Sequence, residues 1–492
     1  VKKGKGGVLR VAGWLDLSRS FHLAPGSPAR YDSASAAGSL YNIFVGSHTM
    51  SFNRILEKYR SISFSERDKG ERFERLMQAY LQTDPKYANN LEKVWLWNEF
   101  PGRKDLGGSD TGIDLVALTG SGEYWAVQCK CFQESARIDK PAVDSFLATS
   151  GRTFGNEQGE TAAFAQRLWI STTNKWGAKA TEAITNQQPQ VTRINLHDLI
   201  EAPVDWEQLD KGVSGEQARL CQRDLMPHQR EALEAAEAYF KSNSRGRLIM
   251  ACGTGKTFTS LRIAENETNG KGPVLFLVPS IALLGQTLRE WTAFSSVPLH
   301  PVCICSDPEI SRKKTKNEDQ DRFSVVDLAL PASTNVKSIL RQFQSIRERN
   351  RPGMTVVFST YQSIEVIAQA QQELIQAGDA FGRFGLIICD EAHRTTGVSV
   401  AGEDESAFIK VHDNDFLQAD KRLYMTATPR LYTDDAKSRA AKENAVLCSM
   451  DDPELYGEEI YRIGFGRAVE QGLLTDYKVL ILTLNDGVSD NS

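Results

Sequence analysis

A glycine-rich loop that ends in Lys-Thr constrains this chain more than any other feature. The sequence MACGTGKT runs from Met250 to Thr257 and includes the end of an apolar segment. In loops of this type, backbone N–H groups surround phosphates, the lysine reaches their outer oxygens, and the last hydroxyl ligates magnesium. The loop therefore predicts a strand, a turn and a helix in succession. It also predicts phosphate contacts for Gly253, Thr254, Gly255, Lys256 and Thr257.

A pair of adjacent acids follows later in the chain. Asp390 and Glu391 belong to the sequence CDEAH, directly after the apolar run LIIC. A carboxylate at the end of a strand can hold Mg²⁺, and its neighbour can orient and polarise the water that attacks a terminal phosphate. We therefore expect ATP hydrolysis as well as ATP binding. Each piece alone could be an ordinary turn or helix start, but their order argues against that alternative.

The ordered motifs resemble those of superfamily 2 helicases and translocases. The further matches are LMPHQ (Leu225 to Gln229) as the Q motif, VPSIALLGQ (Val278 to Gln286), STYQS (Ser359 to Ser363) and MTATPR (Met425 to Arg430). Met250 stands where the general phosphate-loop pattern has its first glycine, which this family does not require. The resemblance implies that Gln229 reads adenine and that the motifs lie on a RecA-like lobe.

Apolar segments alternate with helical patterns through this region. The expected strands are LIMAC, VLFLVPS, TVVFSTY, GLIICD and RLYMTAT, and such alternation is typical of a parallel sheet. Right-handed crossovers bring the carboxyl ends of these strands to one edge, where the motifs would meet. The fold class predicted for this part is therefore α/β.

Composition limits the other possibilities. The chain has 492 residues, which is more than one ordinary core holds, and its net charge is −5. Any nucleic-acid contact would therefore need a local basic surface. The eight cysteines form no CxxC pair, which argues against a zinc site, and no apolar stretch reaches membrane-spanning length. We expect a cytoplasmic protein with reduced thiols.

A second group of polar residues lies in the segment from Thr111 to Cys131. It predicts two strands joined by a turn at residues 120–123. Alternation along WAVQCKC places Trp125, Val127, Cys129 and Cys131 toward a core. Gln128 and Lys130 then point to the opposite surface, where Asp114 of the preceding strand could join them. Asp114 and the Gln128 carbonyl would hold Mg²⁺, and Lys130 would position or deprotonate water for phosphodiester cleavage.

A further carboxylate should come from the helix in ERDKGERFERLMQAYL. The buried stripe at helical spacing is predicted to be Phe73, Leu76, Met77, Tyr80 and Leu81. Glu74 falls on the flank of this stripe, whereas Glu71 points nearly away, so Glu74 is the better candidate metal ligand.

These elements resemble the PD-(D/E)xK nucleases, in particular the Mrr-like restriction endonucleases. The matching pieces are Phe73-Glu74, Gly112-Ile113-Asp114 and Gln128-Cys129-Lys130. Gln128 replaces an acid that many members carry, which leaves the number of metals open. A hairpin with a merely solvated face, or a degenerate nuclease fold that only binds DNA, remains an alternative. The isolated histidines His197, His228 and His412 receive no chemical role.

The predicted organisation has five parts. A disordered or non-native leader occupies 1–49, the nuclease domain 50–207, a linker 208–224, the first RecA-like lobe 225–475, and the start of a truncated second lobe 476–492. The charged insertion SRKKTKNEDQDR, between residues 307 and 334, is interpreted as a solvated loop, with a DNA-binding arm as the alternative.

The two halves together resemble the N-terminal part of type ISP restriction enzymes. This resemblance implies an ATP-dependent DNA restriction endonuclease that translocates on double-stranded DNA, with ATP and Mg²⁺ as cofactors. It also implies methyltransferase and target-recognition regions in a missing C-terminal part of the same polypeptide. The alternatives are a DNA-repair or antiphage helicase with a degenerate nuclease domain, and a nucleotide-gated DNA-binding module.

Overall fold

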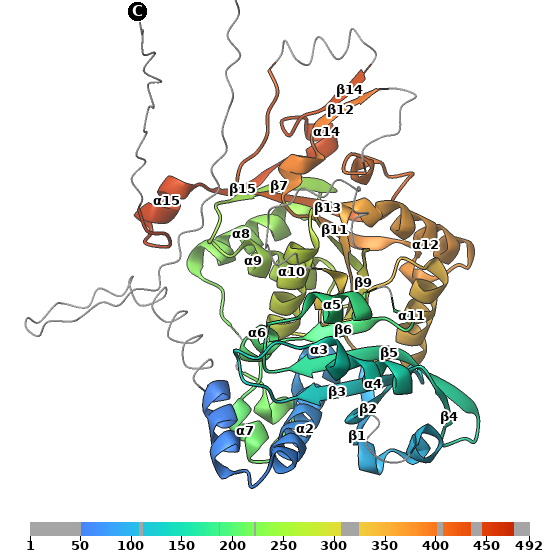
Figure 1. Ribbon diagram of the computed structural model, residues 1–492. Helices are drawn as coiled ribbons and strands as arrows, with labels where there is room; N and C mark the ends of the chain where they lie inside the picture. The colour runs from blue at the N-terminus through green and yellow to red at the C-terminus, as the bar shows by residue number, and fades with distance from the viewer. Residues whose placement is uncertain are drawn as a thin grey trace, which may run out of the picture.

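Two α/β units, each built on its own sheet, follow each other along the chain (Figure 1). The computed structural model describes residues 51–107, 112–185, 187–220, 223–306, 324–400, 407–433 and 445–476. The predicted leader and most of the charged insertion lie outside these residues, as does the predicted second-lobe start apart from residue 476. The predicted domain boundaries stay predictions.

The first unit has a mixed six-stranded sheet. Its strand order is β1-β2-β3-β5-β4, and β6 pairs with β5. The strands are β1 (Leu91–Leu96), β2 (Leu115–Thr119), β3 (Tyr124–Lys130), β4 (Thr153–Gly155), β5 (Thr161–Ser171) and β6 (Val191–Ile194). The helices are one over residues 51–62, α2 (Glu66–Thr83), α3 (Pro85–Ala88), α4 (Lys140–Ser150), α5 (Ala178–Ile184), α6 (Leu196–Ile200) and α7 (Trp206–Asp210).

Helix α2 begins where the sequence supplies a cap. The Ser65 side chain accepts a hydrogen bond from Asp68 N, which satisfies one of the free N–H groups at the helix start. The five residues predicted for its apolar stripe are all buried.

Strands β1, β4 and β6 were not expected from the sequence. Short strands at the edge of a sheet have too little alternation of polar and apolar residues to be recognised as strands.

Strand β3 is buried on both faces. Trp125, Val127 and Cys129 belong to one apolar cluster and Ala126 to another, so the two faces do alternate as predicted. The second face, however, is a core beneath α4 and α5 and not an open surface, and Gln128 is completely buried there. The expectation of an outward-facing Gln128 was wrong, because helices cover this sheet on both sides.

The second unit has a seven-stranded parallel sheet. Its order is β15-β7-β13-β11-β8-β10-β9. The strands are β7 (Arg245–Met250), β8 (Val274–Val278), β9 (Leu299–Ile304), β10 (Met354–Thr360), β11 (Phe384–Cys389), β13 (Ala419–Thr426) and β15 (Glu458–Ile463). The helices are α8 (Pro227–Phe240), α9 (Lys256–Glu267), α10 (Ile281–Phe294), α11 (Val336–Arg349), α12 (Ile364–Gln376), α14 (Pro453–Tyr456) and α15 (Phe465–Glu470).

All five predicted strands of this sheet are present, and the parallel arrangement is confirmed. Strands β9 and β15 extend it at the two edges. A short antiparallel ribbon of β12 (Gly397–Val400) and β14 (Ala445–Cys448) stands beside the sheet (Figure 1). Because all seven strands run the same way, the loops that follow β7, β8, β10, β11 and β13 lie at one edge, as expected for a RecA-like lobe.

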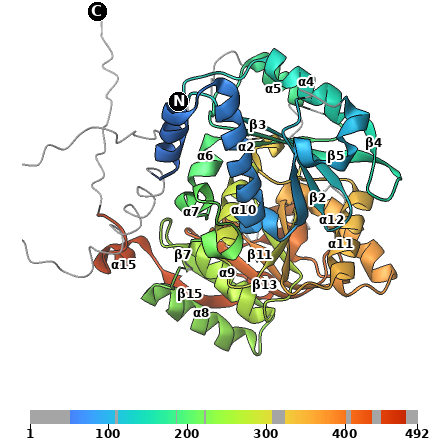
Figure 2. The same ribbon diagram turned by 90° about the horizontal axis from the view of Figure 1, so that it is seen from below.

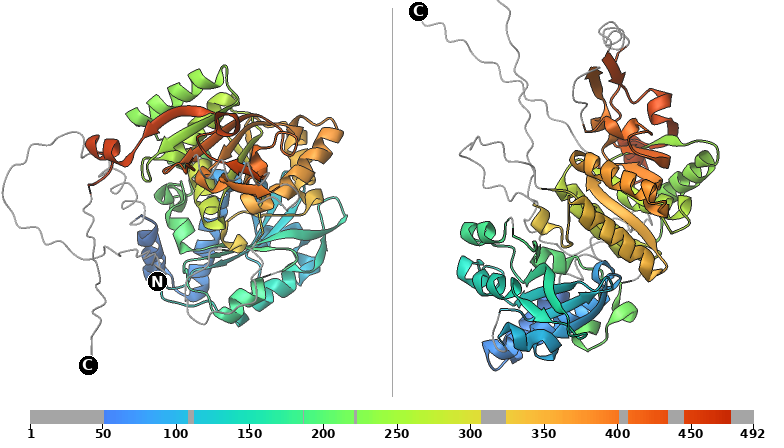
Figure 3. Two further views of the ribbon diagram at one scale, coloured as in Figure 1. Left: turned by 90° about the horizontal axis from the view of Figure 1, so that it is seen from above. Right: turned by 90° about the vertical axis from the view of Figure 1, so that its right-hand side faces the viewer.

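The two units pack directly against each other (Figures 2 and 3). Helix α3 contacts α10 and β9, and one apolar cluster contains buried residues of both units. Tyr87 Oη donates a hydrogen bond of 2.7 Å to Ala329 O across the interface. Arg193 and Asp327 form an ion pair at 2.6 Å, with both side chains about 10% exposed. A shared core with a buried ion pair favours a fixed arrangement over free domain motion.

Candidate active sites

The phosphate loop joins β7 to α9. Gly253 and Gly255 have φ angles of +84° and +81°, in the left-handed region that favours glycine. A Cβ on Gly255 would also lie 2.3 Å from Gln229 Nε2, so the Gln229 side chain would have to move to admit any other residue. The loop thereby brings the N-terminus of α9, with its free N–H groups, to the edge of the sheet, where an anion can bind.

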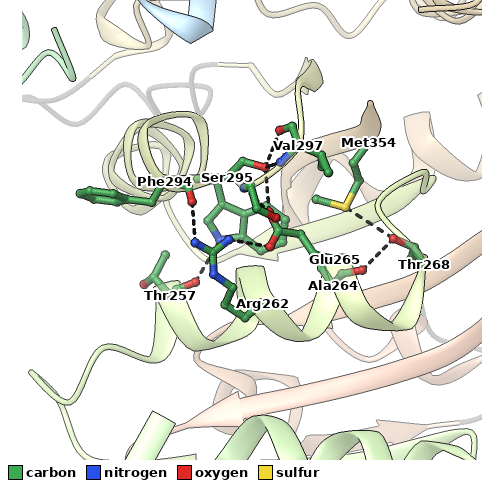
Figure 4. Close-up of polar contacts among 11 residues, drawn as sticks. Thr257, Arg262, Ala264, Glu265, Thr268, Phe294, Ser295, Val297 and Met354 are labelled. Atoms are coloured by element: carbon green, nitrogen blue, oxygen red, sulfur yellow. Dashed lines mark hydrogen bonds and ion pairs between the residues drawn. The ribbon is translucent and has the colours of Figure 1, made fainter. Parts of the chain in front are cut away.

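Polar contacts with α10 hold helix α9 in place (Figure 4). Arg262 Nη2 donates a hydrogen bond of 3.0 Å to Phe294 O at the end of α10. Trp291 Nε1 donates one of 3.1 Å to Thr257 O in the first turn of α9. The two contacts lie more than one helical turn apart along α9. They therefore fix both the position and the direction of the helix that carries Lys256 and Thr257.

The two acids of CDEAH lie beside this loop. Asp390 is 7% exposed, and burial, followed by the charge of Glu391, raises the pKa of Asp390 to about 6, while Lys256 opposes the shift. Lys256 and Asp390 are thus brought together, as the sequence predicted. Two neighbouring carboxylates with one lysine leave a deficit of positive charge in a partly dry site. Such a site fits Mg²⁺, which prefers carboxylate and hydroxyl oxygens.

These residues line a cavity of about 860 Å³. Its size is within the range of about 300–1,000 Å³ that is usual for small-molecule sites. All five predicted loop residues, together with Gln229, Asp390 and Glu391, lie in its wall. Gln229 donates through Nε2 to Thr254 O at 3.3 Å and accepts through Oε1 from Met226 N at 2.9 Å. Its side chain therefore connects the start of α8 to the loop.

The sequence motifs did not indicate three charged residues of the cavity wall, which are Arg223, Glu231 and Glu290. Arg223 precedes the Q motif, and Glu290 lies on α10. Burial raises the pKa of Glu290, Arg223 lowers it, and Asp390 raises it. No motif marks Arg223. Glu290 follows Gln286 by four residues, and this helical spacing was the signal that could have placed it on the face toward the cavity.

A contact between two motifs was also not predicted. His393 Nδ1 and Thr426 Oγ1 lie 3.0 Å apart and share a hydrogen bond. His393 Nδ1 is also 3.3 Å from Glu391 Oε2. The side chain of His393 therefore links the acid pair to the sequence MTATPR at the end of β13.

The second candidate site lies in the first unit, at the end of β3. Burial, followed by the charge of Asp114, raises the pKa of Glu74 to about 7, while Lys130 opposes the shift. Burial is the largest cause that raises the pKa of the Cys129 thiol. The charges of Asp114 and Glu74 raise this pKa further, and Lys130 lowers it. The structure thus brings the predicted acids and lysine together from helix α2, the residue before β2 and the end of β3.

Gln128 completes this group. Its Nε2 donates a hydrogen bond to Asp114 Oδ2, and the same oxygen accepts one of 2.7 Å from Cys129 N. Its Oε1 is buried and makes no hydrogen bond. A buried acceptor without a donor is costly unless something else satisfies it.

The donor set of this group fits one Mg²⁺. Across the described ranges, no three His, Cys, Asp or Glu side chains converge in one place. A metal here would therefore use two carboxylates and the Gln128 carbonyl, and take its remaining oxygens from water and phosphate. The raised pKa of Glu74 and the unsatisfied Gln128 Oε1 are two independent signs that a cation would stabilise the group.

Comparison with known families agrees with this division. Residues 82–216 match the restriction endonuclease family, and residues 222–431 match the type III restriction enzyme res subunit. The type ISP restriction-modification enzyme LlaBIII, solved bound to DNA, is 37% identical over 82% of this chain, with a TM-score of 0.64. The chain is a homologue of type ISP restriction-modification enzymes. It contains an Mrr-type restriction endonuclease domain followed by a helicase-like ATPase domain.

Other relatives share parts of the chain. A probable helicase of African swine fever virus is 28% identical over 59% of this chain, and the EcoAI type I endonuclease subunit of Escherichia coli is 25% identical over 50%. A nuclease-deletion mutant of the type ISP enzyme LlaGI is 43% identical over 52% of the chain, with a TM-score of 0.40. The chain covers 25% of LlaBIII and 28% of the viral helicase, so it spans about a quarter of the length of these two relatives.

Proposed function

We propose that this chain carries the nuclease and the motor of an ATP-dependent DNA restriction endonuclease. The helicase-like lobe hydrolyses ATP and drives translocation on double-stranded DNA, and the Mrr-type domain cleaves DNA with Mg²⁺. The observation that carries the proposal is the assembly of Glu74, Asp114, Gln128 and Lys130 in the same chain as a complete phosphate loop and acid pair. The LlaBIII complex with DNA supports DNA as the partner.

The residues of the motor site have separable roles in this proposal. The loop N–H groups and Lys256 bind the phosphates of ATP, and Gln229 recognises adenine. Thr257 and Asp390 hold Mg²⁺, which shields the phosphate charge when it is bound. Glu391 orients and polarises the attacking water. Glu391 lines the cavity, and because its side chain is 26% exposed, water can reach it.

In the nuclease site, Glu74, Asp114 and the Gln128 carbonyl hold Mg²⁺, which makes the bound phosphate a better electrophile. Lys130 positions or deprotonates the attacking water and offsets the negative charge that builds up on the phosphate. Glu74 must be ionised to bind a cation. Its raised pKa means that metal binding releases a proton near neutral pH.

Cleavage of a DNA substrate with and without ATP tests the proposal. We expect Lys256→Ala to abolish ATP hydrolysis and ATP-dependent cleavage, and Lys130→Ala to abolish cleavage while leaving ATP hydrolysis intact. Matched controls are Lys241→Ala and Lys140→Ala, each of which removes an exposed lysine paired with an acid four residues away in the chain. Unchanged cleavage by Lys130→Ala would overturn the nuclease assignment, and unchanged ATP hydrolysis by Lys256→Ala the motor assignment.

The main alternative is a DNA-repair or antiphage helicase whose nuclease domain only binds DNA. The charges of Asp114 and Lys130 both act on Glu74, and Gln128 donates a hydrogen bond to Asp114, which supports a catalytic domain. DNA binding without any cleavage by the wild-type protein, under conditions in which ATP is hydrolysed, would support the alternative.

For the described helices, none has the length and apolar character needed to cross a bilayer. We place the activity in the cytoplasm, where intracellular DNA is accessible.

A further inference from the structure

The backbone of Glu391 is in an unfavourable conformation. Its φ and ψ angles are +49° and +45°, in the left-handed region that a residue with a Cβ rarely adopts. Such a conformation persists only where the surrounding structure imposes it. Glu391 is the residue that orients the attacking water in the function proposed above. Whatever holds this turn therefore also sets the position of the catalytic carboxylate.

The turn that follows Glu391 is anchored through Thr395. The 3₁₀ turn η7 (Ala392–Thr395) ends at this residue, which is completely buried. Thr395 Oγ1 donates a hydrogen bond of 2.8 Å to Ala392 O, next to Glu391 in the chain. Since its one proton is used there, Thr395 Oγ1 accepts from Tyr456 Oη at 3.0 Å. The Tyr456 hydroxyl thus fixes the side chain that closes the turn.

His412 holds the backbone of the same residue. Its Nε2 lies 3.2 Å from Thr395 O, and its Nδ1 lies 2.9 Å from Tyr424 Oη. A carbonyl can only accept, so Nε2 carries the proton, and Nδ1 accepts from the tyrosine hydroxyl. Burial lowers the pKa of His412 to about 4, which keeps the ring neutral as this arrangement requires.

One arginine connects the two residues that contact the turn. Arg245 donates a hydrogen bond of 2.7 Å to His412 O through Nη2 and one of 2.9 Å to Leu455 O through Nη1. Leu455 precedes Tyr456, so both contacting segments are held by the first residue of β7. Strand β7 leads into the phosphate loop. This hydrogen-bond network therefore connects β7, the strand before the phosphate loop, to η7, the turn after Glu391.

We propose that His412 and Tyr456 are positioning residues for ATP hydrolysis, which hold the turn after Glu391 through Thr395. Neither residue lies in a motif of the chain, and neither lines the nucleotide cavity. Their loss should therefore leave nucleotide binding intact and misplace the carboxylate that orients water. The inference rests on the proposed ATP hydrolysis.

Single substitutions in the full chain test this proposal. Tyr456→Phe removes one hydroxyl and keeps the ring. We expect it to lower kcat for ATP hydrolysis about tenfold, which corresponds to about 1.4 kcal/mol, with KM unchanged. His412→Ala should have at least as large an effect. His412→Gln, which keeps an N–H donor near Thr395 O, should recover part of the loss. Tyr87→Phe, which removes another buried hydroxyl that donates to a carbonyl far from this turn, is the matched control.

Hydrogen exchange of the peptide from Cys389 to Thr396 gives a second readout that does not need turnover. We expect faster exchange there in Tyr456→Phe and His412→Ala, and wild-type exchange in Tyr87→Phe. Wild-type kcat and exchange in both network variants would overturn the proposal, as would a raised KM with an unchanged kcat. A wild-type chain that binds but does not hydrolyse ATP would overturn the proposed function, while the exchange comparison would still decide the positioning role.

Discussion

Replacing Glu74 by glutamine separates the stability of the nuclease site from its activity. The pKa of Glu74 is raised from 4.5 to about 7, mainly by burial and then by Asp114. The folded state therefore holds the Glu74 proton more tightly than the unfolded state does. In metal-free protein, the resulting stability is fully present below pH 4.5 and is lost as pH rises through about 7. Glutamine has nearly the same shape and does not titrate.

The size of the effect follows from the shift. A rise of about 2.5 in the pKa corresponds to about 3 kcal/mol in the free energy of unfolding, and the partial exposure of Glu74 makes the true value smaller. In EDTA, we expect the free energy of unfolding of Glu74→Gln to exceed that of the wild type increasingly between pH 5 and pH 8. Saturating Mg²⁺ should remove this advantage, because the ionised Glu74 then gains a ligand.

Urea unfolding at several pH values, with EDTA and with Mg²⁺, measures these differences. DNA cleavage by Glu74→Gln should be lost although the protein is more stable at pH 8. Glu71→Gln is the control, since Glu71 is an exposed residue on the same helix, paired with Arg67. The reasoning is refuted if wild type and Glu74→Gln show the same pH profile in EDTA, or if Mg²⁺ stabilises both equally.

Three further predictions concern the interface and the motor site. Asp327→Ala leaves Arg193 buried without its ion-pair partner, and it should lower the free energy of unfolding in urea by about 3–5 kcal/mol. Replacing both residues by apolar ones should lower it much less. Equal losses in the two variants would contradict this prediction. Gly255→Ala should weaken nucleotide binding in calorimetry at least tenfold, because alanine is strained at a φ of +81° and its methyl group would displace Gln229. Wild-type affinity would refute this. The metal-free pKa of Asp390 is about 6, so Mg²⁺-dependent nucleotide binding should weaken as pH falls through 6. The Asp390→Asn variant should bind nucleotide weakly at every pH. A wild-type affinity that does not change from pH 5 to pH 8 would count against this prediction.

Several parts of the fold follow from local sequence. The stripe from Phe73 to Leu81 repeats at helical spacing, and the apolar runs before the phosphate loop and before Asp390 are long enough to identify buried strands. Their alternation with helices predicts a parallel sheet, which the structure has. The edge strands β9 and β15 did not stand out, because each mixes polar with apolar residues.

The candidate sites divide in the same way. The phosphate loop could be predicted because its residues are contiguous, and their chemistry depends on the backbone of one turn. Glu74 could be chosen over Glu71 because helical periodicity distinguishes the two sides of one helix. The buried position of Gln128 could not be predicted, because strand alternation indicates which residues share a face of the sheet but not whether that face is covered. His412 could not either, since its partners are 12 and 17 residues away in the chain.

The sequence by itself determined which reactive groups this protein has and the local backbone that presents them. Glycines set the loop dihedrals, and spacing along one helix or strand sets which side chains point together. Only the tertiary structure decided what those groups meet: Asp327 against Arg193 between the two units, and the ring of His412 against Thr395. Such contacts depend on how whole helices and sheets pack, and packing is a property of distant segments together and not of any one of them.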